Sequence, residues 1–150
     1  MKFDHQTTWV LAADTNTCRI YKSTTKPYDL TLIKELQHPQ SKLRDIELTS
    51  GKPGRYNTGT TTHGTYTQQS DPKEIEIDNF ARTIAEELDN SRNAHDYDNL
   101  IVIAAPHMNG LLFHHINKHV THLVTHNLKN DVIHFTEKEL SDFLRKNLLA

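Results

Sequence analysis

An unbroken run of apolar residues at positions 100–105, ended by Pro106, places the tightest limit on the fold of this chain. A strand that is apolar at every position must be covered on both faces, which is typical of a central strand with a parallel neighbour. Parallel neighbours are joined by a crossover that usually contains a helix. The run therefore predicts an α/β fold with a buried central strand.

The first part of the chain predicts strands that follow one another in a meander. Residues 8–13 are mostly apolar, and residues 17–22 alternate between the two faces of a strand. Between them, residues 14–16 (Asp-Thr-Asn) favour a turn, because Asp and Asn side chains bond to nearby backbone groups. This pattern indicates a hairpin. Residues 30–36 predict a third strand, which ends at His38-Pro39.

Later segments predict helices and one further strand. Residues 71–74 (Asp-Pro-Lys-Glu) begin a helix, because Asp can cap it and Pro suits its first position. A second helix is expected just past Pro106. Residues 136–139 (Thr-Glu-Lys-Glu) form a capping box that begins the last helix. Residues 120–125 predict a strand between these two helices. One face of the first helix is apolar: Ile77, Phe80, Ala81, Ile84 and Leu88.

The predicted order of elements is β-β-β-α-β-α-β-α. Meandering strands followed by β-α units predict an α/β fold with one mixed sheet of about five strands and helices on both faces. Ribonuclease-H-like domains share this order. At 150 residues, the chain is expected to form a single domain over positions 1–150.

A long polar loop is predicted at about residues 42–72. No aliphatic side chain occurs between Leu48 and Ile75, and most of the 5 glycines of the chain lie in that interval. Loops of this length in compact domains are usually functional or disordered. We therefore expect a partner or substrate to contact this loop.

The loop combines cations and rings in a way that suits RNA. Cationic side chains can neutralise phosphates, and aromatic rings can stack on unpaired bases. The loop also contains acidic residues such as Asp45 and Glu47, so a solvated loop without a ligand remains the alternative. The candidate contacts are Lys42, Arg44, Lys52, Arg55 and Lys73 for phosphates, Tyr56, His63 and Tyr66 for bases, and Gln68 and Gln69 for a water, if hydrolysis occurs.

Other candidate sites are weaker. Asp14 stands where ribonuclease-H-like nucleases bind metal, but two-metal catalysis needs several carboxylates, and the buried strand ends in Ala105-Pro106. Asp14 is therefore interpreted as a turn residue. His115 and His119 have the spacing of zinc ligands on one helix, but they lack an acidic third ligand. The sequence predicts neither a metal site nor a cofactor, and it contains no hydrolase or nucleotide-binding glycine motif.

Composition restricts the location and the partners. The net charge of -2 excludes a generally polycationic binder, although a local basic surface remains open. The single cysteine, Cys18, cannot form an intramolecular disulfide, which favours a reducing compartment. The apolar run at residues 9–13 is too short for a secretory signal or a membrane span. We therefore expect a cytoplasmic protein without membrane insertion.

A set of motifs, in order and spacing, resembles the bacterial host-attachment protein family over nearly the whole chain. The motifs are Trp9-Val10-Leu11-Ala12-Ala13-Asp14, His38-Pro39, Leu43-Arg44-Asp45, Gly51-Lys52-Pro53-Gly54-Arg55, Asp71-Pro72-Lys73-Glu74 before Phe80-Ala81, and Ala104-Ala105-Pro106 before Gly110-Leu111-Leu112. That family is similar to the central domain of archaeal and eukaryotic peptide-chain release factors. The resemblance implies a ribonuclease-H-like topology and action near the ribosome or on tRNA.

The release-factor resemblance has one clear departure. In release factors, a Gly-Gly-Gln loop before a helix enters the peptidyl-transferase centre. The glycine-rich loop of this chain also precedes a helix, but its nearest text is Gly64-Thr65-Tyr66-Thr67-Gln68. The sequence therefore favours a protein that is not an enzyme, and it leaves peptidyl-tRNA hydrolysis open.

The expected function is that of an RNA- or ribosome-associated accessory factor that acts through the loop, with ribosome, tRNA or other RNA as partner. The alternative from another class is a protein–protein interaction module that contributes indirectly to host-cell attachment. A hydrolase with an unrecognised site is a third hypothesis.

Overall fold

The computed structural model describes residues 6–23, 29–38 and 71–149. They form one mixed sheet with the strand order β3-β2-β1-β4-β5. The antiparallel pairs are β1–β2 and β2–β3, and the parallel pairs are β1–β4 and β4–β5. The predicted α/β class and single five-stranded sheet are confirmed. The strands are β1 (Thr8–Ala13), β2 (Thr17–Ser23), β3 (Thr31–Gln37), β4 (Asn99–Ala104) and β5 (Val124–Leu128).

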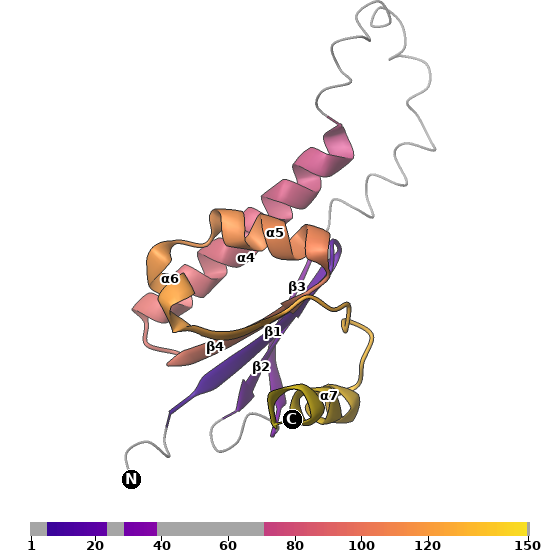
Figure 1. The fold of residues 1–150 in the computed structure, drawn as a ribbon. Coiled ribbons are helices and arrows are strands. Elements are labelled where there is room, and N and C mark those ends of the chain that lie inside the picture. The colour runs from indigo at the N-terminus through magenta and orange to yellow at the C-terminus, as the bar shows by residue number, and fades with distance from the viewer. Residues whose placement is uncertain (1–5, 24–28, 39–70, 150) are drawn as a thin grey trace, which may run out of the picture.

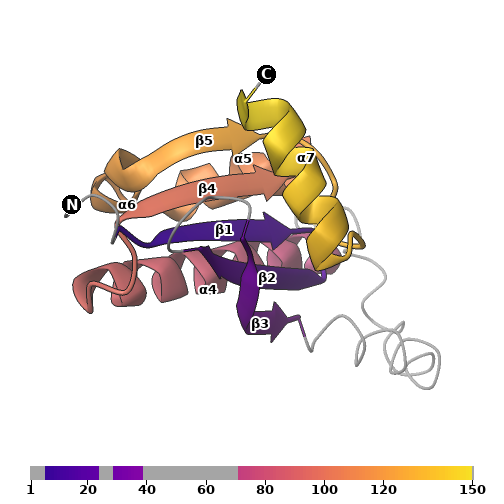
Figure 2. The same cartoon turned by 90° about the horizontal axis from the view of Figure 1, so that it is seen from below.

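Helices cover both faces of this sheet, as Figures 1 and 2 show. On one face lie α4 (Pro72–Asn93), α5 (Pro106–His115) and the short α6 (Lys118–Leu123). On the other face α7 (Glu137–Leu149) crosses the strands. The prediction of helices on both faces is confirmed.

Each central strand contributes side chains to two hydrophobic cores, because successive side chains on a strand point to opposite faces. Trp9 and Leu11 of β1 pack under α4 and α5, while Val10 packs under α7. The predicted buried strand, β4, behaves in the same way: Val102 belongs to the first core and Ile101 to the second. The apolar run in the sequence therefore reflects burial of both faces.

The hairpin between β1 and β2 forms through Asp14, as predicted. Oδ1 of Asp14 accepts hydrogen bonds from the backbone N–H groups of Asn16 and Thr17, at 2.8 Å each. The backbone N–H of Asp14 donates to the Thr17 carbonyl oxygen at 2.9 Å. The side chain thus takes over bonds that the tight turn cannot make within the sheet.

The predicted helix starts are also confirmed. The Asp71 side chain accepts from the backbone N–H of Lys73 at 3.0 Å, and Pro72 occupies the first position of α4. At α7, Thr136 Oγ1 accepts from the Glu139 N–H at 3.0 Å, and Glu139 Oε1 accepts from the Thr136 N–H at 2.9 Å. This reciprocal pair is a capping box.

The predicted strand at residues 120–125 is wrong in position. The chain forms α6 first, and β5 begins only at Val124. The Asn117 side chain caps α6 by accepting from the Val120 N–H at 2.9 Å. Val120 is fully buried, so packing in the core outweighs the strand preference of this β-branched residue. An additional helix therefore interrupts the predicted order of elements.

No helix within the described ranges is long and apolar enough to cross a membrane. Of the predicted loop at about 42–72, only Asp71 and Pro72 lie within the described residues. Pro72 already belongs to α4, so the helix begins at the last position assigned to the loop.

Candidate functional site

Segments far apart in the sequence meet where the parallel strands β1 and β4 end. The backbone N–H of His38, just after β3, donates to the Asn16 carbonyl oxygen in the β1–β2 turn at 2.9 Å. Glu74, in the first turn of α4, contacts His107, in the first turn of α5, at 3.2 Å between Oε1 and Nε2. We call residues 14–16, His38, 71–74 and 105–107 the carboxyl-end edge. In open α/β sheets, ligands bind at this kind of edge.

Among the sequence-predicted contact residues, the structure places only Lys73 at this edge. Lys73 is exposed in the first turn of α4. The remaining predicted contacts lie outside the described residues, so their roles stay predictions: Lys42, Arg44, Lys52, Arg55, Tyr56, His63, Tyr66, Gln68 and Gln69.

His38 is an edge residue that the sequence marked only as the end of a strand. Its ring stacks on Phe80 of α4, with 5.2 Å between centroids and 11° between planes. The side chain is buried, and its Nδ1 has no hydrogen-bond partner among the described residues. Burial lowers the pKa of His38, and the carboxylate of Glu76 opposes that shift. The edge therefore includes a buried imidazole with an unused nitrogen.

The start of α5 contributes backbone donors to the same edge. Its N-cap residue, Ala105, offers no side-chain hydrogen bond, and Pro106 holds the first position. Uncapped amides at a helix start attract anions. The carboxylate of Glu74 contacts the His107 ring at this helix start, and the exposed Lys73 adds a cation to the edge. The edge is thus suited to mixed polar contacts.

The described residues provide no nuclease-like metal site. The Asp14 carboxylate accepts hydrogen bonds within the hairpin turn, which confirms its interpretation as a turn residue. No group of three or more histidine, cysteine, aspartate or glutamate residues in the described segments could hold a metal ion.

The histidine pair with zinc-ligand spacing is divided between two helices. α5 ends at His115, and Asn117 caps the next helix, which carries His119. His115 instead contacts Asp78 of α4, with 2.8 Å between Nε2 and Oδ1. The two histidines therefore do not share one helix.

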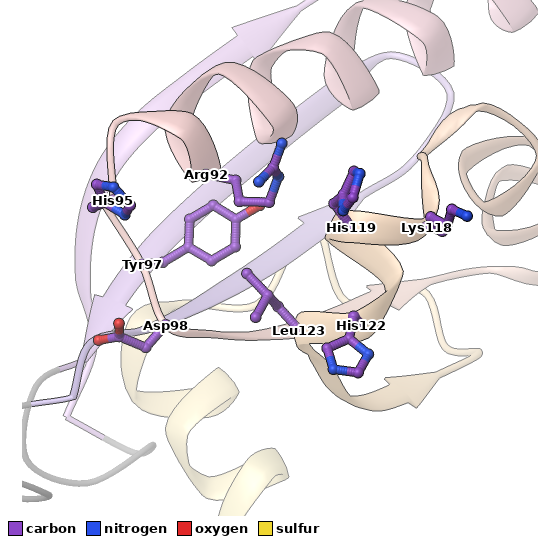
Figure 3. A pocket seen from close by; sticks show the side chains of 8 residues that line it. All are labelled: Arg92, His95, Tyr97, Asp98, Lys118, His119, His122 and Leu123. Carbon is purple, nitrogen blue, oxygen red and sulfur yellow. The ribbon is translucent and has the colours of Figure 1, made fainter.

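A second candidate site, which sequence reasoning missed, lies at the opposite edge of the sheet. It is a pocket of about 470 Å³ between the end of α4, the following loop and α6 (Figure 3). The histidines on α6 were visible as a cluster in the sequence, but their neighbours come from a segment more than twenty residues earlier. The pocket is lined by Arg92, His95, Tyr97, Asp98, Lys118, His119, His122 and Leu123.

The sequence from residue 9 to residue 144 matches the profile of a family described as "Protein required for attachment to host cells". The chain belongs to this host-attachment family. The matched range runs from β1 into α7, so it spans the residues of both the carboxyl-end edge and the pocket. The predicted family is confirmed.

Structural comparison adds a fold-level likeness. A solved structure titled "Archaeal protein" superposes on this host-attachment family member with a TM-score of 0.53 at 12% sequence identity. The match covers 97% of this chain and 35% of that one, so the chain spans about a third of the archaeal protein. At this identity the likeness shows the fold alone. No curated protein sequence matches the chain.

Proposed function

We propose that this host-attachment family member is an RNA- or ribosome-associated accessory factor that binds through residues 42–72 and the carboxyl-end edge. One observation carries the proposal. The described elements on either side of residues 39–70, β3 and α4, meet at the edge where β1 and β4 end. The described residues that flank this segment, His38 and Asp71, therefore lie next to the position where α/β sheets bind their ligands.

We further propose that the domain is ribonuclease-H-like, in the manner of the central domain of release factors. An antiparallel β3-β2-β1 meander continued by the parallel strands β4 and β5 supports this assignment. The proposal places the protein in the cytoplasm, because ribosomes are there.

The binding chemistry would divide between charge and stacking. Arg44, Lys52 and Arg55 would neutralise phosphates, while Tyr56 and Tyr66 would stack on unpaired bases. Lys42, His63 and Lys73 would extend the contact, with Lys73 entering it from the start of α4. For single strands, the logarithm of the binding constant falls with the logarithm of the salt concentration, by about 0.7 for each phosphate neutralised. Three phosphate contacts would therefore give a slope near -2.

Co-sedimentation with ribosomes at low and high salt tests the proposal, together with fluorescence anisotropy on tRNA and on an unstructured RNA. The test variant is Arg44→Ala/Lys52→Ala/Arg55→Ala. We expect it to leave the ribosomal fraction and to lower the magnitude of the salt slope by about 2.

A charge-matched control removes three cations from α7, on the far face of the sheet: Lys138→Ala/Arg145→Ala/Lys146→Ala. This control should bind RNA like the wild type. Equal losses of RNA binding in the two triple variants would show that the effect depends only on net charge. Absent or salt-insensitive RNA binding by the wild type would refute the proposal.

A protein partner is the second candidate function, and the edge strand β3 favours it. Among the described residues, β3 lies at one border of the sheet, and it exposes Leu32 by 40% and Ile33 by 38%. A partner can add a strand to such an edge and cover both side chains. Crosslinking in cells through a photoreactive residue at position 33 tests this function. Recovery of one defined protein, lost on Leu32→Lys/Ile33→Lys, would support it over RNA binding.

A further inference from the structure

The pocket at the opposite edge of the sheet, where β1 and β4 begin, is lined by cationic side chains around an apolar floor. Figure 3 shows Arg92 at the end of α4 above the ring of Tyr97, with Lys118, His119 and His122 projecting from α6. At about 470 Å³ the pocket falls in the range of small-ligand sites. Its residues lie at the opposite end of α4 from the carboxyl-end edge, so a ligand in this pocket is independent of the proposed function.

Much of the donor capacity of the pocket is unused. Arg92 directs Nε and Nη2 to Oδ1 of Asp89, at 3.1 and 2.9 Å, but its Nη1 has no partner among the described residues. Within the same segments, the side chains of Lys118 and His122 make no hydrogen bond or ion pair. These groups can donate to a ligand that presents several acceptor oxygens.

The pocket walls are fixed. Tyr97 is buried and stacks on Trp9 with 4.7 Å between ring centroids, and its hydroxyl donates to the Leu88 carbonyl oxygen at 2.7 Å. The loop after α4 passes through His95 at φ 60 and is tied back by its N–H, which donates to the Arg92 carbonyl oxygen at 2.9 Å. Pre-ordered walls reduce the entropy that a ligand must overcome on binding.

The carboxylates near the pocket already have hydrogen-bond donors. Asp89, on α4, is held ionised by hydrogen bonds from Asn117 and Arg92, which lower its pKa. Asp98 accepts from the Thr7 backbone N–H at 2.9 Å. Both carboxylates therefore accept hydrogen bonds from other groups, while Nη1 of Arg92 and the ammonium of Lys118 remain available to an anion.

We propose that this pocket binds a small phosphate-bearing anion. Lys118 and Nη1 of Arg92 supply constant positive charge and donors. Each ring of His119 and His122 adds an N–H donor, whichever tautomer is present. Free inorganic phosphate and the phosphate of a nucleotide present the same chemistry, and the test separates them.

Calorimetric titration with sodium sulfate at pH 7 and constant ionic strength measures binding of the anion. Loss of one positive charge about 4 Å from the anion in water should weaken binding about fivefold. The variant Lys118→Ala/His119→Ala, which removes that charge and a ring donor, should therefore bind sulfate at least about fivefold more weakly. The matched control is His134→Ala/Lys146→Ala, which should bind like the wild type, because His134 contacts Phe135 of the other core and Lys146 lies on α7.

Titrations with AMP, adenosine and inorganic phosphate identify the source of the anion. AMP binding that is tighter than phosphate binding assigns a nucleotide, and equal binding assigns free phosphate. Amide shifts of residues 118–122 on sulfate addition to the wild type give a readout that needs no variant. Unchanged sulfate affinity in Lys118→Ala/His119→Ala, adenosine binding as tight as AMP binding, or the absence of these shifts would overturn the proposal.

Discussion

Replacing Asn109 by alanine tests how α5 is held on the sheet. The Asn109 side chain is 2% exposed. Its amide nitrogen donates to the Ala104 carbonyl oxygen at 3.3 Å and to Oδ1 of Asn127 at 2.7 Å. The Asn127 amide donates back to Oδ1 of Asn109 at 3.1 Å. These bonds join the first turn of α5 to the ends of β4 and β5.

We expect Asn109→Ala to lower the free energy of unfolding by about 2–3 kcal/mol. Each of the lost hydrogen bonds contributes a net of about 0.5–1.5 kcal/mol. The expected loss is smaller than the largest possible sum of these bond energies, because the bond to Ala104 is long and because the exposed Asn127 side chain can bind water instead. For a domain of this size, the loss corresponds to a fall in Tm of about 4–12 °C.

Urea unfolding, followed by circular dichroism and by the fluorescence of Trp9, measures the change. A double-mutant cycle with Asn127→Ala isolates the interaction between the two amides, for which we expect a coupling of about 1 kcal/mol. Asn130→Ala is the matched control, because Asn130 is exposed just beyond β5; its effect should stay within about 0.5 kcal/mol.

Two results would refute this reasoning. Equal destabilisation by Asn109→Ala and Asn130→Ala would show that the buried amide contributes no more than a surface one. Strict additivity in the cycle would show that the two amides do not interact in solution.

Three further predictions concern stability and reactivity. A Cβ at Gly110 would meet no atom within 4 Å, so Gly110→Ala should raise the free energy of unfolding by about 0.5–1 kcal/mol in the same urea assay. Burial lowers the pKa of His38 in the folded protein. The unfolded chain therefore binds this proton more readily. The contribution of neutral His38 to stability is complete above about pH 6.5 and is lost as the pH falls below that value. His38→Phe, which can keep the stack on Phe80, should therefore weaken the loss of stability between pH 7 and 5; an unchanged pH profile would contradict the assignment. Burial, reinforced by the carboxylates of Glu87 and Asp14, raises the pKa of the Cys18 thiol, so DTNB at pH 8 should label the folded protein at least about tenfold more slowly than the protein in urea.

The parts of the fold that were predictable from the sequence depend on local chemistry. Asp14 makes its turn with its own neighbours, and residues 136–139 complete their capping box within one helical turn. The all-apolar run of β4 already implied cover on both faces. Such signals need no knowledge of distant contacts, so they can be recognised in one sequence.

The remaining features depend on packing between distant segments. Val120 is buried in α6 because α4 and the sheet surround it, and its residue type alone favours a strand. The pocket joins Arg92 to Lys118 across an intervening strand and helix, a pairing that periodicity cannot indicate. The composition of residues 42–72 predicted a polar loop. The contact between Glu74 and His107 could not be predicted in the same way, because it depends on how α4 and α5 pack together.

The length of α4 sets a spacing between the two candidate sites. Its 22 residues rise by about 1.5 Å each, so the helix is roughly 33 Å long. One end bears Glu74 at the carboxyl-end edge, and the other bears Arg92 in the pocket. A small anion in the pocket cannot reach a ligand at the far end, so both sites can be occupied together without collision. The helix α4 would then keep the two bound groups at a constant separation.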